Sequence, residues 1–499
     1  MPAIEFLMLA SAPPHRQPHP ARQPLSLLMV AALFAATALP MLAQAEPEAG
    51  IPLRMTTELA IADTQVSRAH RSPSTAVVSL TQMGEMALAA QPALIAADAR
   101  TRAEEQRLEQ ARGGLRPSLG GVLGYRRELA DIGGTLPFSS TSGGLRLSIP
   151  LYRPQADAGI DQAQFQQSSS REAEAEGRQD ILLRTIEAFL GSAQADEETD
   201  LLNQERSVLL TQRTLNQRRM EGGVGTVVEV METSSRSESL LSQIEGAQAL
   251  YRTQLAELGR LAWTSVEKVT RVRNSLPPLV IPNDVINAVT LAYEKNPTLA
   301  RLTATLGATR AGITVQRAAL NPTVDLVGNV DRSRLSGGLS GTIPSTGIGV
   351  QLAIPLYTGG VGEARVREAS ALSEAAQAQL DDAGRVLETE LRKAYLALQR
   401  AIEQWRIQNG VLATANATLA ATRKAFDAGA RTNIDLLNSQ QLSFSTQREL
   451  LRARIAVLAA QSRIAALIGD LSPAFLARIE PAFETAASTA TMPPQRSTP

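Results

Sequence analysis

The sequence Ile149-Pro150-Leu151-Tyr152 decides the fold, because it returns 205 positions later as Ile354-Pro355-Leu356-Tyr357. Two further segments recur at the same offset. Gln91-Pro92-Ala93-Leu94 corresponds to Asn296-Pro297-Thr298-Leu299, and Arg116-Pro117-Ser118-Leu119 corresponds to Asn321-Pro322-Thr323-Val324. Three correspondences at one spacing indicate that the chain consists of two structural repeats in tandem.

Each repeat contains two short segments that alternate apolar with small or polar residues, which is the pattern of a β-strand. In the first repeat they cover residues 119–125 and 145–151, and in the second they cover residues 324–330 and 348–354. The segment from Asp131 to Gly144 is rich in Gly, Ser and Thr and predicts an exposed hairpin loop. The strands have the length of membrane-spanning strands, although hairpins of a soluble protein would show the same alternation.

A very long helix is predicted after each copy of the motif. The two helices run from Gln155 to Glu221 and from Gly362 to Ala428, each about 100 Å long at 1.5 Å per residue. Shorter helices return over residues 226–263 and 432–468. Apolar residues recur at heptad spacing from Leu380 to Trp405, which indicates coiled-coil packing.

Pro150 and Pro355 mark the places where a strand gives way to a long helix. Because Pro lacks a backbone donor, both are expected to end a strand. Tyr152 and Tyr357 would then lie at a membrane–water boundary, where Tyr is favoured, or would pack into a core. We predict these four residues as strand–helix joints.

The N-terminal segment has the features of a secretory signal. Arg16 and Arg22 precede an apolar stretch from Leu25 to Leu42, and Ala43-Gln44-Ala45 has the small residues of a cleavage site. We expect cleavage after Ala45, and an uncleaved membrane anchor is the alternative.

The patterns divide the chain into six parts. They are a signal peptide (1–45), an irregular lead-in (46–76), a first repeat (77–270), a Pro-rich linker (271–283), a second repeat (284–471) and a disordered tail (472–499). The second repeat is expected to open with a continuous helix over residues 284–320.

Composition argues against several classes of function. The 499 residues include 49 basic and 49 acidic side chains, and a net charge of zero argues against a nucleic-acid partner. The chain has no Cys, and its His residues, His15, His19 and His70, all precede the repeats. We therefore expect no enzyme based on His or Cys, no metal site and no cofactor, while chemistry based on carboxylates alone stays open.

The predicted strands pose a problem of closure. No stretch after the signal reaches the roughly 18 apolar residues of a spanning helix, so the mature protein would have to enter a membrane through its strands. Four strands cannot close a barrel of useful bore, which needs about eight or more. If the strands lie in a membrane, several chains must share one barrel.

With these features the chain resembles the TolC-like outer-membrane efflux family over about Val77 to Leu471. The segment Gly429-Ala430-Arg431-Thr432-Asn433-Ile434-Asp435-Leu436-Leu437 is similar to the family pattern Gly-x-Arg-Thr-x-x-Asp-x-Leu. The resemblance implies a mainly α fold with a small β part and duplicated halves. Long coiled-coil helices would form a periplasmic tunnel, and four strands per chain would contribute to a shared twelve-stranded trimeric membrane β-barrel.

The resemblance also implies a location and partners. It places the protein in the outer membrane of a Gram-negative cell, in contact with lipid and extending into the periplasm. A homotrimer would take cargo from an inner-membrane ABC-type exporter or proton-driven pump through a periplasmic adaptor protein.

Type I protein secretion is the expected function, because the chain lacks the Cys needed for an N-terminal lipid anchor. Efflux of drugs or metals is the alternative within the family. A periplasmic structural coiled coil without a barrel is the alternative outside it.

Acidic residues at the helix hairpins are the candidate gate. The positions that match the family's carboxylate ring are Glu229 and Asp435, and Glu232 lies one helical turn after Glu229. Three copies of each would favour cations. Thr226 and Glu229 also form a Ser/Thr-x-x-Glu capping box, and Asp435 has a similar relation to Thr432, so the acids can serve as caps as well.

Arg431 aligns with a family Arg that locks the closed tip by pairing with an acid of a neighbouring hairpin, here Glu229. Phe426 stands where the family often has Tyr, so one closing hydrogen bond is absent. The hairpin tips also carry Gly222, Gly223, Gly225 and Gly429. These glycines would let adaptor helices approach closely, although turn geometry alone also favours Gly.

Overall fold

The structure is a computed structural model that describes residues 77–131, 135–275, 277–282, 284–337 and 340–484. The predicted signal peptide and lead-in, residues 1–76, lie outside the described residues.

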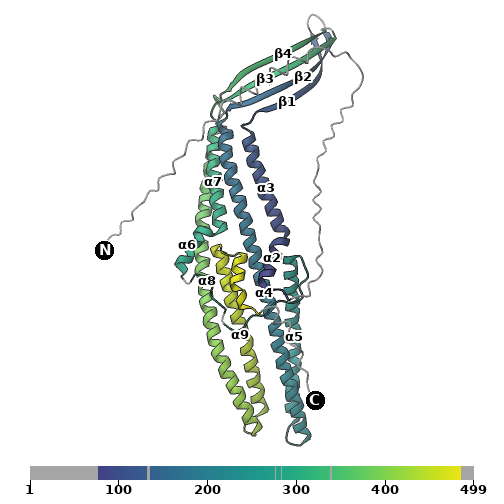
Figure 1. The fold of residues 1–499 in the computed structure, drawn as a ribbon, viewed down its shortest axis with the longest axis vertical. Helices are drawn as coiled ribbons and strands as arrows, with labels where there is room; N and C mark the ends of the chain where they lie inside the picture. Colours follow the sequence, from purple (N-terminus) through teal and green to yellow (C-terminus); the bar gives the residue numbers. More distant parts are fainter. Residues whose placement is uncertain (1–76, 132–134, 276, 283, 338–339, 485–499) are drawn as a thin grey trace, which may run out of the picture. The chain divides into compact units, whose positions relative to one another are not determined.

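The two repeats contain the same elements in the same order (Figure 1). The first consists of α2 (Leu80–Ala90), α3 (Pro92–Gly113), β1 (Ser118–Asp131), β2 (Thr135–Tyr152), α4 (Pro154–Glu221) and α5 (Val227–Ala262). The second consists of α6 (Val285–Lys295), α7 (Pro297–Ala318), β3 (Thr323–Gly337), β4 (Gly341–Ala353), α8 (Val361–Asp427) and α9 (Asn433–Ile468). The predicted duplication and the mainly helical fold are therefore confirmed.

The four strands form one antiparallel sheet in the order β1-β2-β3-β4. Residues of β1 and β4 lie at its edges, and all thirteen residues of β4 are exposed. The prediction of a loop from Asp131 to Gly144 is wrong, because β2 already begins at Thr135. Its Ser- and Gly-rich part pairs with β1 on one side and, from Phe138 onward, with β3 on the other, so backbone hydrogen bonds order a segment whose side chains suggest a loop.

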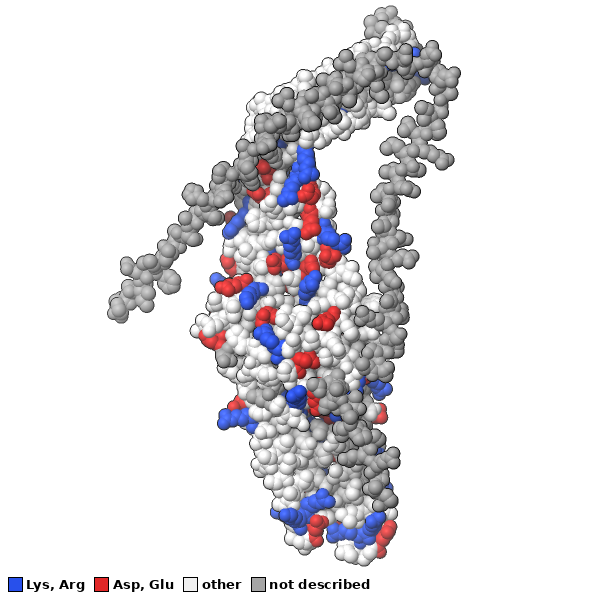
Figure 2. Space-filling model, in the orientation of Figure 1, with Lys and Arg blue, Asp and Glu red and all other residues white. Residues whose placement is uncertain are grey.

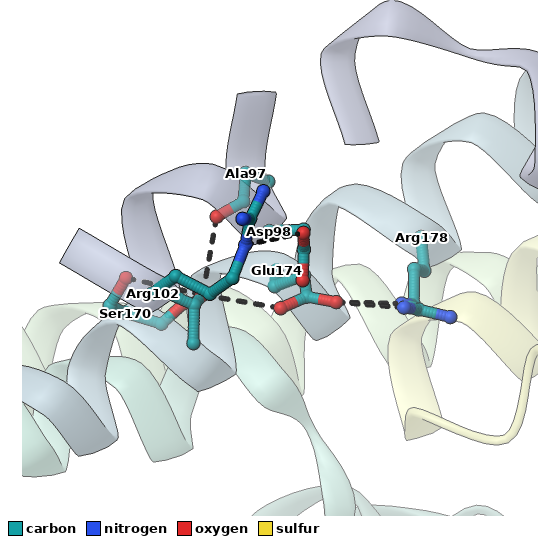
Figure 3. Close-up of polar contacts among 7 residues, drawn as sticks. Ala97, Asp98, Arg102, Ser170, Glu174 and Arg178 are labelled. Atoms are coloured by element: carbon teal, nitrogen blue, oxygen red, sulfur yellow. Dashed lines mark hydrogen bonds and ion pairs between the residues drawn. The ribbon is translucent and has the colours of Figure 1, made fainter. Parts of the chain in front are cut away.

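Helix α4 packs against α3, α5, α7 and α9, whereas α8 packs mainly against α9 and α7 (Figure 1). Polar contacts reinforce the α3–α4 pair (Figure 3). Thr101 Oγ1 of α3 lies 3.4 Å from Ser170 Oγ and 3.2 Å from Glu174 Oε2 of α4, and Arg178 pairs with Glu174 at 2.7 Å. Within α3, Arg102 forms an ion pair with Asp98 at 3.1 Å. No described helix is both long and apolar enough to cross a membrane.

The helix predicted over residues 284–320 is two helices, which corrects the sequence analysis. It breaks at Asn296, whose backbone is extended (φ −68°, ψ 119°) and whose side chain accepts a hydrogen bond from Leu299 N. Pro297 follows as the first residue of α7, and its ring disfavours a helical conformation at the preceding residue. The same break separates α2 from α3 at Gln91 and Pro92, where it was expected.

The tail predicted as disordered from residue 472 is ordered up to Glu484, so that prediction is wrong for its first part. Helix α10 (Pro473–Ile479) and the 3-10 helix η2 (Glu480–Ala482) belong to the main core. Phe475 is fully buried, and Phe483 meets Phe189 of α4 edge to face, with ring centroids 5.4 Å apart. Burial of aromatic rings stabilises this end of the chain. Residues 485–499 lie outside the described residues.

Candidate gate at the helix hairpin tips

Two turns close the helix hairpins, one between α4 and α5 and one between α8 and α9, and their geometry is the same. Val224 N donates to Arg219 O at 2.9 Å, and Ala430 N donates to Ala425 O at 2.8 Å, as in a Schellman motif. The left-handed position is Gly223 (φ 76°) in the first turn and Gly429 (φ 74°) in the second. Backbone conformation therefore requires these two glycines.

Both return helices begin with a complete capping box, as the sequence predicts. Glu229 N donates to Thr226 Oγ1 at 3.3 Å, and Thr226 N donates to Glu229 Oε2 at 3.1 Å. In the second hairpin, Asp435 N donates to Thr432 Oγ1 at 3.3 Å and Thr432 N donates to Asp435 Oδ2 at 3.1 Å. Thr432 Oγ1 also donates to Asp435 Oδ2 at 2.9 Å. Hydrogen bonds from the Thr432 backbone and side chain, and then Arg431, hold the pKa of Asp435 below its ordinary value. Both acids are therefore held in fixed orientations.

Glu232 differs from the two capping acids. It is half-buried on the turn of α5 after Glu229, and it makes no hydrogen bond or ion pair with any part of the chain that the structure describes. Capping therefore does not account for this acid, and its part in an acidic ring stays a prediction.

Arg431 and Phe426 lie on the second hairpin. Arg431 Nη1 is 3.9 Å from Asp435 Oδ2, and both side chains are exposed to solvent. The pairing of Arg431 with Glu229 of a neighbouring hairpin is a contact between copies and stays a prediction. Phe426 is buried, and the guanidinium carbon of Arg219 lies 4.7 Å from its ring centroid. A cation–π contact thus joins the end of α4 to the end of α8 where a tyrosine hydroxyl is absent.

The other tip glycines have different surroundings. Gly222 ends α4 with negative φ (−80°) and is exposed. A Cβ at Gly225 would lie 2.9 Å from Met220 N and 3.1 Å from Arg219 C, so the chain passes too close to itself for a side chain. Figure 2 shows basic and acidic side chains together at the ends of both hairpins. Contact of these tips with an adaptor stays a prediction.

A buried amide network joins the two hairpins, and the sequence analysis missed it. Asn433, the first residue of α9, is 2% exposed. Its Oδ1 accepts from Asn216 Nδ2 at 3.0 Å and from Gln212 Nε2 at 3.4 Å, both on α4. Asn216 Nδ2 also lies 3.0 Å from Thr233 Oγ1 of α5. The network therefore holds the start of α9 against the first hairpin.

Comparison of the repeats could have given a signal for this network. Asn216 and Thr233 correspond, 206 positions later, to Thr422 and Ser439. Ser439 Oγ lies 3.3 Å from Thr422 Oγ1, so the same pair of positions bridges the helices in both hairpins. Only the pair in the first hairpin is extended by an amide to the other hairpin.

The strand–helix joints differ between the repeats. β4 ends at Ala353, before Pro355, as expected, and Tyr357 is 90% exposed. β2 continues to Tyr152, so the prediction that Pro150 ends its strand is wrong. The register of β2 against β3 shifts between Pro150 and Tyr152, which indicates a β-bulge. A bulge tolerates a residue that has no backbone N–H to donate.

An ion pair fixes the joint of the first repeat. Arg153, which follows β2, donates two hydrogen bonds to Asp325 of β3, at 2.8 and 3.0 Å. This bidentate pair attaches the start of α4 to the sheet.

Comparison with known proteins identifies the family. The family model described as "Outer membrane efflux protein" matches residues 83–262 and 288–470, which are the two repeats. The chain belongs to the outer membrane efflux protein family. Its members and structural neighbours are outer-membrane channels that extend into the periplasm, and this is the location of the chain.

Curated relatives are similar over most of their length. Alkaline protease secretion protein AprF of Pseudomonas aeruginosa is 29% identical over 340 residues, covering 66% of this chain and 70% of AprF. Proteases secretion protein PrtF of Dickeya chrysanthemi is 26% identical, covering 65% of this chain and 72% of PrtF. Outer membrane protein TolC of Vibrio cholerae is 22% identical, covering 76% of this chain and 88% of TolC.

Solved structures of outer-membrane channels share the fold. A crystal structure of CusC superposes with a TM-score of 0.70 at 17% identity, covering 81% of this chain and 95% of CusC. The Campylobacter jejuni channel CmeC superposes with a TM-score of 0.68 at 15% identity, covering 90% of this chain and 96% of CmeC. At these identities the likeness concerns the fold alone.

Proposed function

We propose that the chain is the outer-membrane exit duct of a type I protein secretion system. Three copies would close one barrel from their four-stranded sheets, and their helices would form a duct into the periplasm. An ABC-type exporter of the inner membrane would deliver the cargo through an adaptor protein bound at the hairpin tips. The duct conducts cargo and catalyses no covalent chemistry.

The open sheet supports the trimer. β1 and β4 are edge strands, and large apolar residues of the sheet such as Leu123 and Ile348 are 91% and 75% exposed. An exposed strand edge is a site for pairing with another strand, and an exposed apolar face is a site for contact with lipid or another apolar surface. Closure with further copies of the chain would satisfy both.

Similarity to secretion proteins is the single observation that favours protein cargo. AprF, named for alkaline protease secretion, shares 29% identity with the chain, whereas the TolC proteins of Vibrio cholerae and Escherichia coli share 22% and 20%. Small-molecule efflux is the second candidate, because Brucella suis BepC, named an outer membrane efflux protein, is 21% identical.

The two candidates can be separated in one host. The chain is expressed in a Gram-negative strain that lacks its own outer-membrane channel but carries a protease exporter and its adaptor. Protease activity in the medium is expected, while sensitivity to dyes and detergents stays that of the parent strain. Restored resistance without secreted protease would overturn the proposal in favour of efflux. A chain that forms no heat-modifiable trimer in the outer membrane would instead be a structural coiled coil.

At the tips, we propose that Glu229, Glu232 and Asp435 of three chains ring the periplasmic end of the duct. Capping fixes Glu229 and Asp435, and Glu232 makes no contact that would neutralise it within the described residues. Nine carboxylates around one axis would attract cations and allow divalent ions to block the duct.

A further inference from the structure

One face of the sheet is apolar along most of its length. Directly paired residues of an antiparallel sheet lie on the same face, so the register assigns each row to a face. One row of this face contains Leu119, Leu147, Gly328 and Ile348, and another contains Ile149, Leu326 and Val350. In the view of Figure 2, the part of the sheet that grey atoms leave uncovered is almost free of charge.

Tyrosines bound this apolar face at both ends. Tyr125 pairs with Thr141, and Tyr152 pairs with Val324. Thr141 and Tyr152 are eleven positions apart on β2, which corresponds to about 36 Å along a strand. In a barrel whose strands tilt by about 45°, the height of the band is about 25 Å, the height of the apolar band of outer-membrane barrels. The face therefore has the dimensions and the aromatic edges of a lipid-facing surface.

Three arginines gather on the same face at the end away from the helices. Arg334 is in the row of Tyr125, Arg332 is in the adjacent row of Leu123, and Arg127 is one row beyond Tyr125. All three are exposed, and none pairs with an acid among the described residues. No described side chain in the rows of this face is acidic.

We propose that Arg127, Arg332 and Arg334 bind the phosphate groups of lipid headgroups in the outer leaflet. This inference rests on the proposed barrel, which turns the apolar face toward lipid. A guanidinium is tolerated at the edge of the hydrocarbon, where it reaches the headgroups, and its planar fork matches phosphate oxygens.

The spacing of the arginines suits a headgroup with more than one phosphate. Arg332 and Arg334 are separated by two positions of one strand, about 7 Å, and Arg127 is two strands away, about 10 Å. Polar neighbours Ser139 and Thr141 lie in the rows of Arg127 and Arg334 and offer hydroxyl donors to the same phosphates.

The test uses the full trimer, extracted from outer membranes in mild detergent. Binding of lipid A, a glycolipid with two phosphates, is measured by native mass spectrometry against phosphatidylethanolamine. The double variant Arg332→Gln/Arg334→Gln should bind lipid A about 30-fold more weakly, from the typical contribution of each basic residue at an anionic membrane surface. The matched control is Arg126→Gln/Arg146→Gln, which removes two charges from the opposite face of the sheet and should bind as the parent does.

Each other outcome counts against the inference. If both double variants bound lipid A equally weakly, the loss of affinity would come from net charge alone. If Arg332→Gln/Arg334→Gln bound lipid A as the parent does, the proposed site would be excluded. Equal binding of phosphatidylethanolamine would show that the arginines do not select a headgroup with two phosphates. Displacement of lipid A by millimolar inorganic phosphate would show that they bind free phosphate as well as lipid, and either result would overturn the inference. Failure to obtain a trimer from the outer membrane would contradict the proposed function, whereas a normal trimer without lipid selectivity would contradict this inference alone.

Discussion

Replacement of Asn433 by Ala tests whether the amide network keeps the two hairpins together. Asn433 is almost fully buried, and its Oδ1 accepts hydrogen bonds at 3.0 and 3.4 Å from two side chains of α4. Its own Nδ2 makes no hydrogen bond, so the substitution also removes one unsatisfied donor. In the proposed duct, opening at the tips would require the start of α9 to leave α4, because the two helices belong to different hairpins.

The structure sets the size of the effect. Each lost hydrogen bond contributes about 0.5–1.5 kcal/mol, and removal of the unsatisfied Nδ2 offsets part of the loss. The net loss is then about 1–2 kcal/mol per chain, which favours the parted hairpins by about 5- to 30-fold in each chain. In a trimer whose hairpins move together, the effects of three chains multiply.

Single-channel recording in planar bilayers measures this change directly. The Asn433→Ala trimer should show higher conductance or longer open periods than the parent. Ser439→Ala is the matched control, because it removes a hydrogen bond of 3.3 Å to Thr422 within the second hairpin and leaves the link between hairpins intact. Equal recordings from the parent and Asn433→Ala, or equal gains from both variants, would refute the role of the network.

Three further predictions concern the tips and the core. Joint replacement of Glu229, Glu232 and Asp435 by Ala should weaken cation selectivity and block by divalent ions in bilayers, and unchanged reversal potentials would eliminate the acidic ring. Arg431→Ser should raise conductance if Arg431 pairs with a neighbouring chain; no change would leave its contact with Asp435, at 3.9 Å, as its only role. Burial raises the pKa of Glu197 to about 7 against the opposing effect of Arg454, so its contribution to stability is present below its ordinary pKa of 4.5 and is lost as pH rises through about 7. On going from pH 8 to pH 5, the melting temperature of the parent should therefore rise more than that of Glu197→Gln, and parallel pH profiles would contradict this.

Local rules were enough to predict the hairpin tips. Thr226 and Thr432, each followed three positions later by an acid, predict capping boxes that the structure contains. Gly223 and Gly429 occupy the left-handed positions that only a residue without Cβ takes readily. These features depend on residues a few positions apart, so the sequence contains all the information they need.

Contacts between distant segments were not predictable in the same way. Asn216 and Asn433 look like ordinary polar residues of a helix surface, and their burial depends on how two hairpins come together. Phe475 and Phe483 lie in a short segment that Pro473 and Pro481 interrupt, and their burial depends on contacts with distant helices that the local sequence does not reveal. The Ser- and Gly-rich start of β2 is ordered by backbone pairing with two neighbours, to which side-chain composition gives little guidance.

The two repeats differ in the side chains that they contribute to the contact between the hairpins near the tips. Long polar donors of the first hairpin reach the second through hydrogen bonds or a cation–π contact: they are Gln212, Asn216, Arg219 and Arg236. The residues 206 positions later are Thr418, Thr422, Ala425 and Leu442, which are too short or too apolar to make such contacts in return.

Near the tips, the first hairpin therefore supplies the donors of the contacts between the two hairpins. An exact duplication would place equal donors on both hairpins, and neither would have a preferred partner. Close to the tips, α9 meets the first hairpin through Asn433 and Asn438. Further along α9, Arg448 and Arg452 donate to Glu205 and Glu198 of α4, each at 2.6 Å. A helix held at its first turns by side-chain hydrogen bonds can be released there without disturbing the apolar core that fixes its other end, where Leu451 and Leu458 are fully buried.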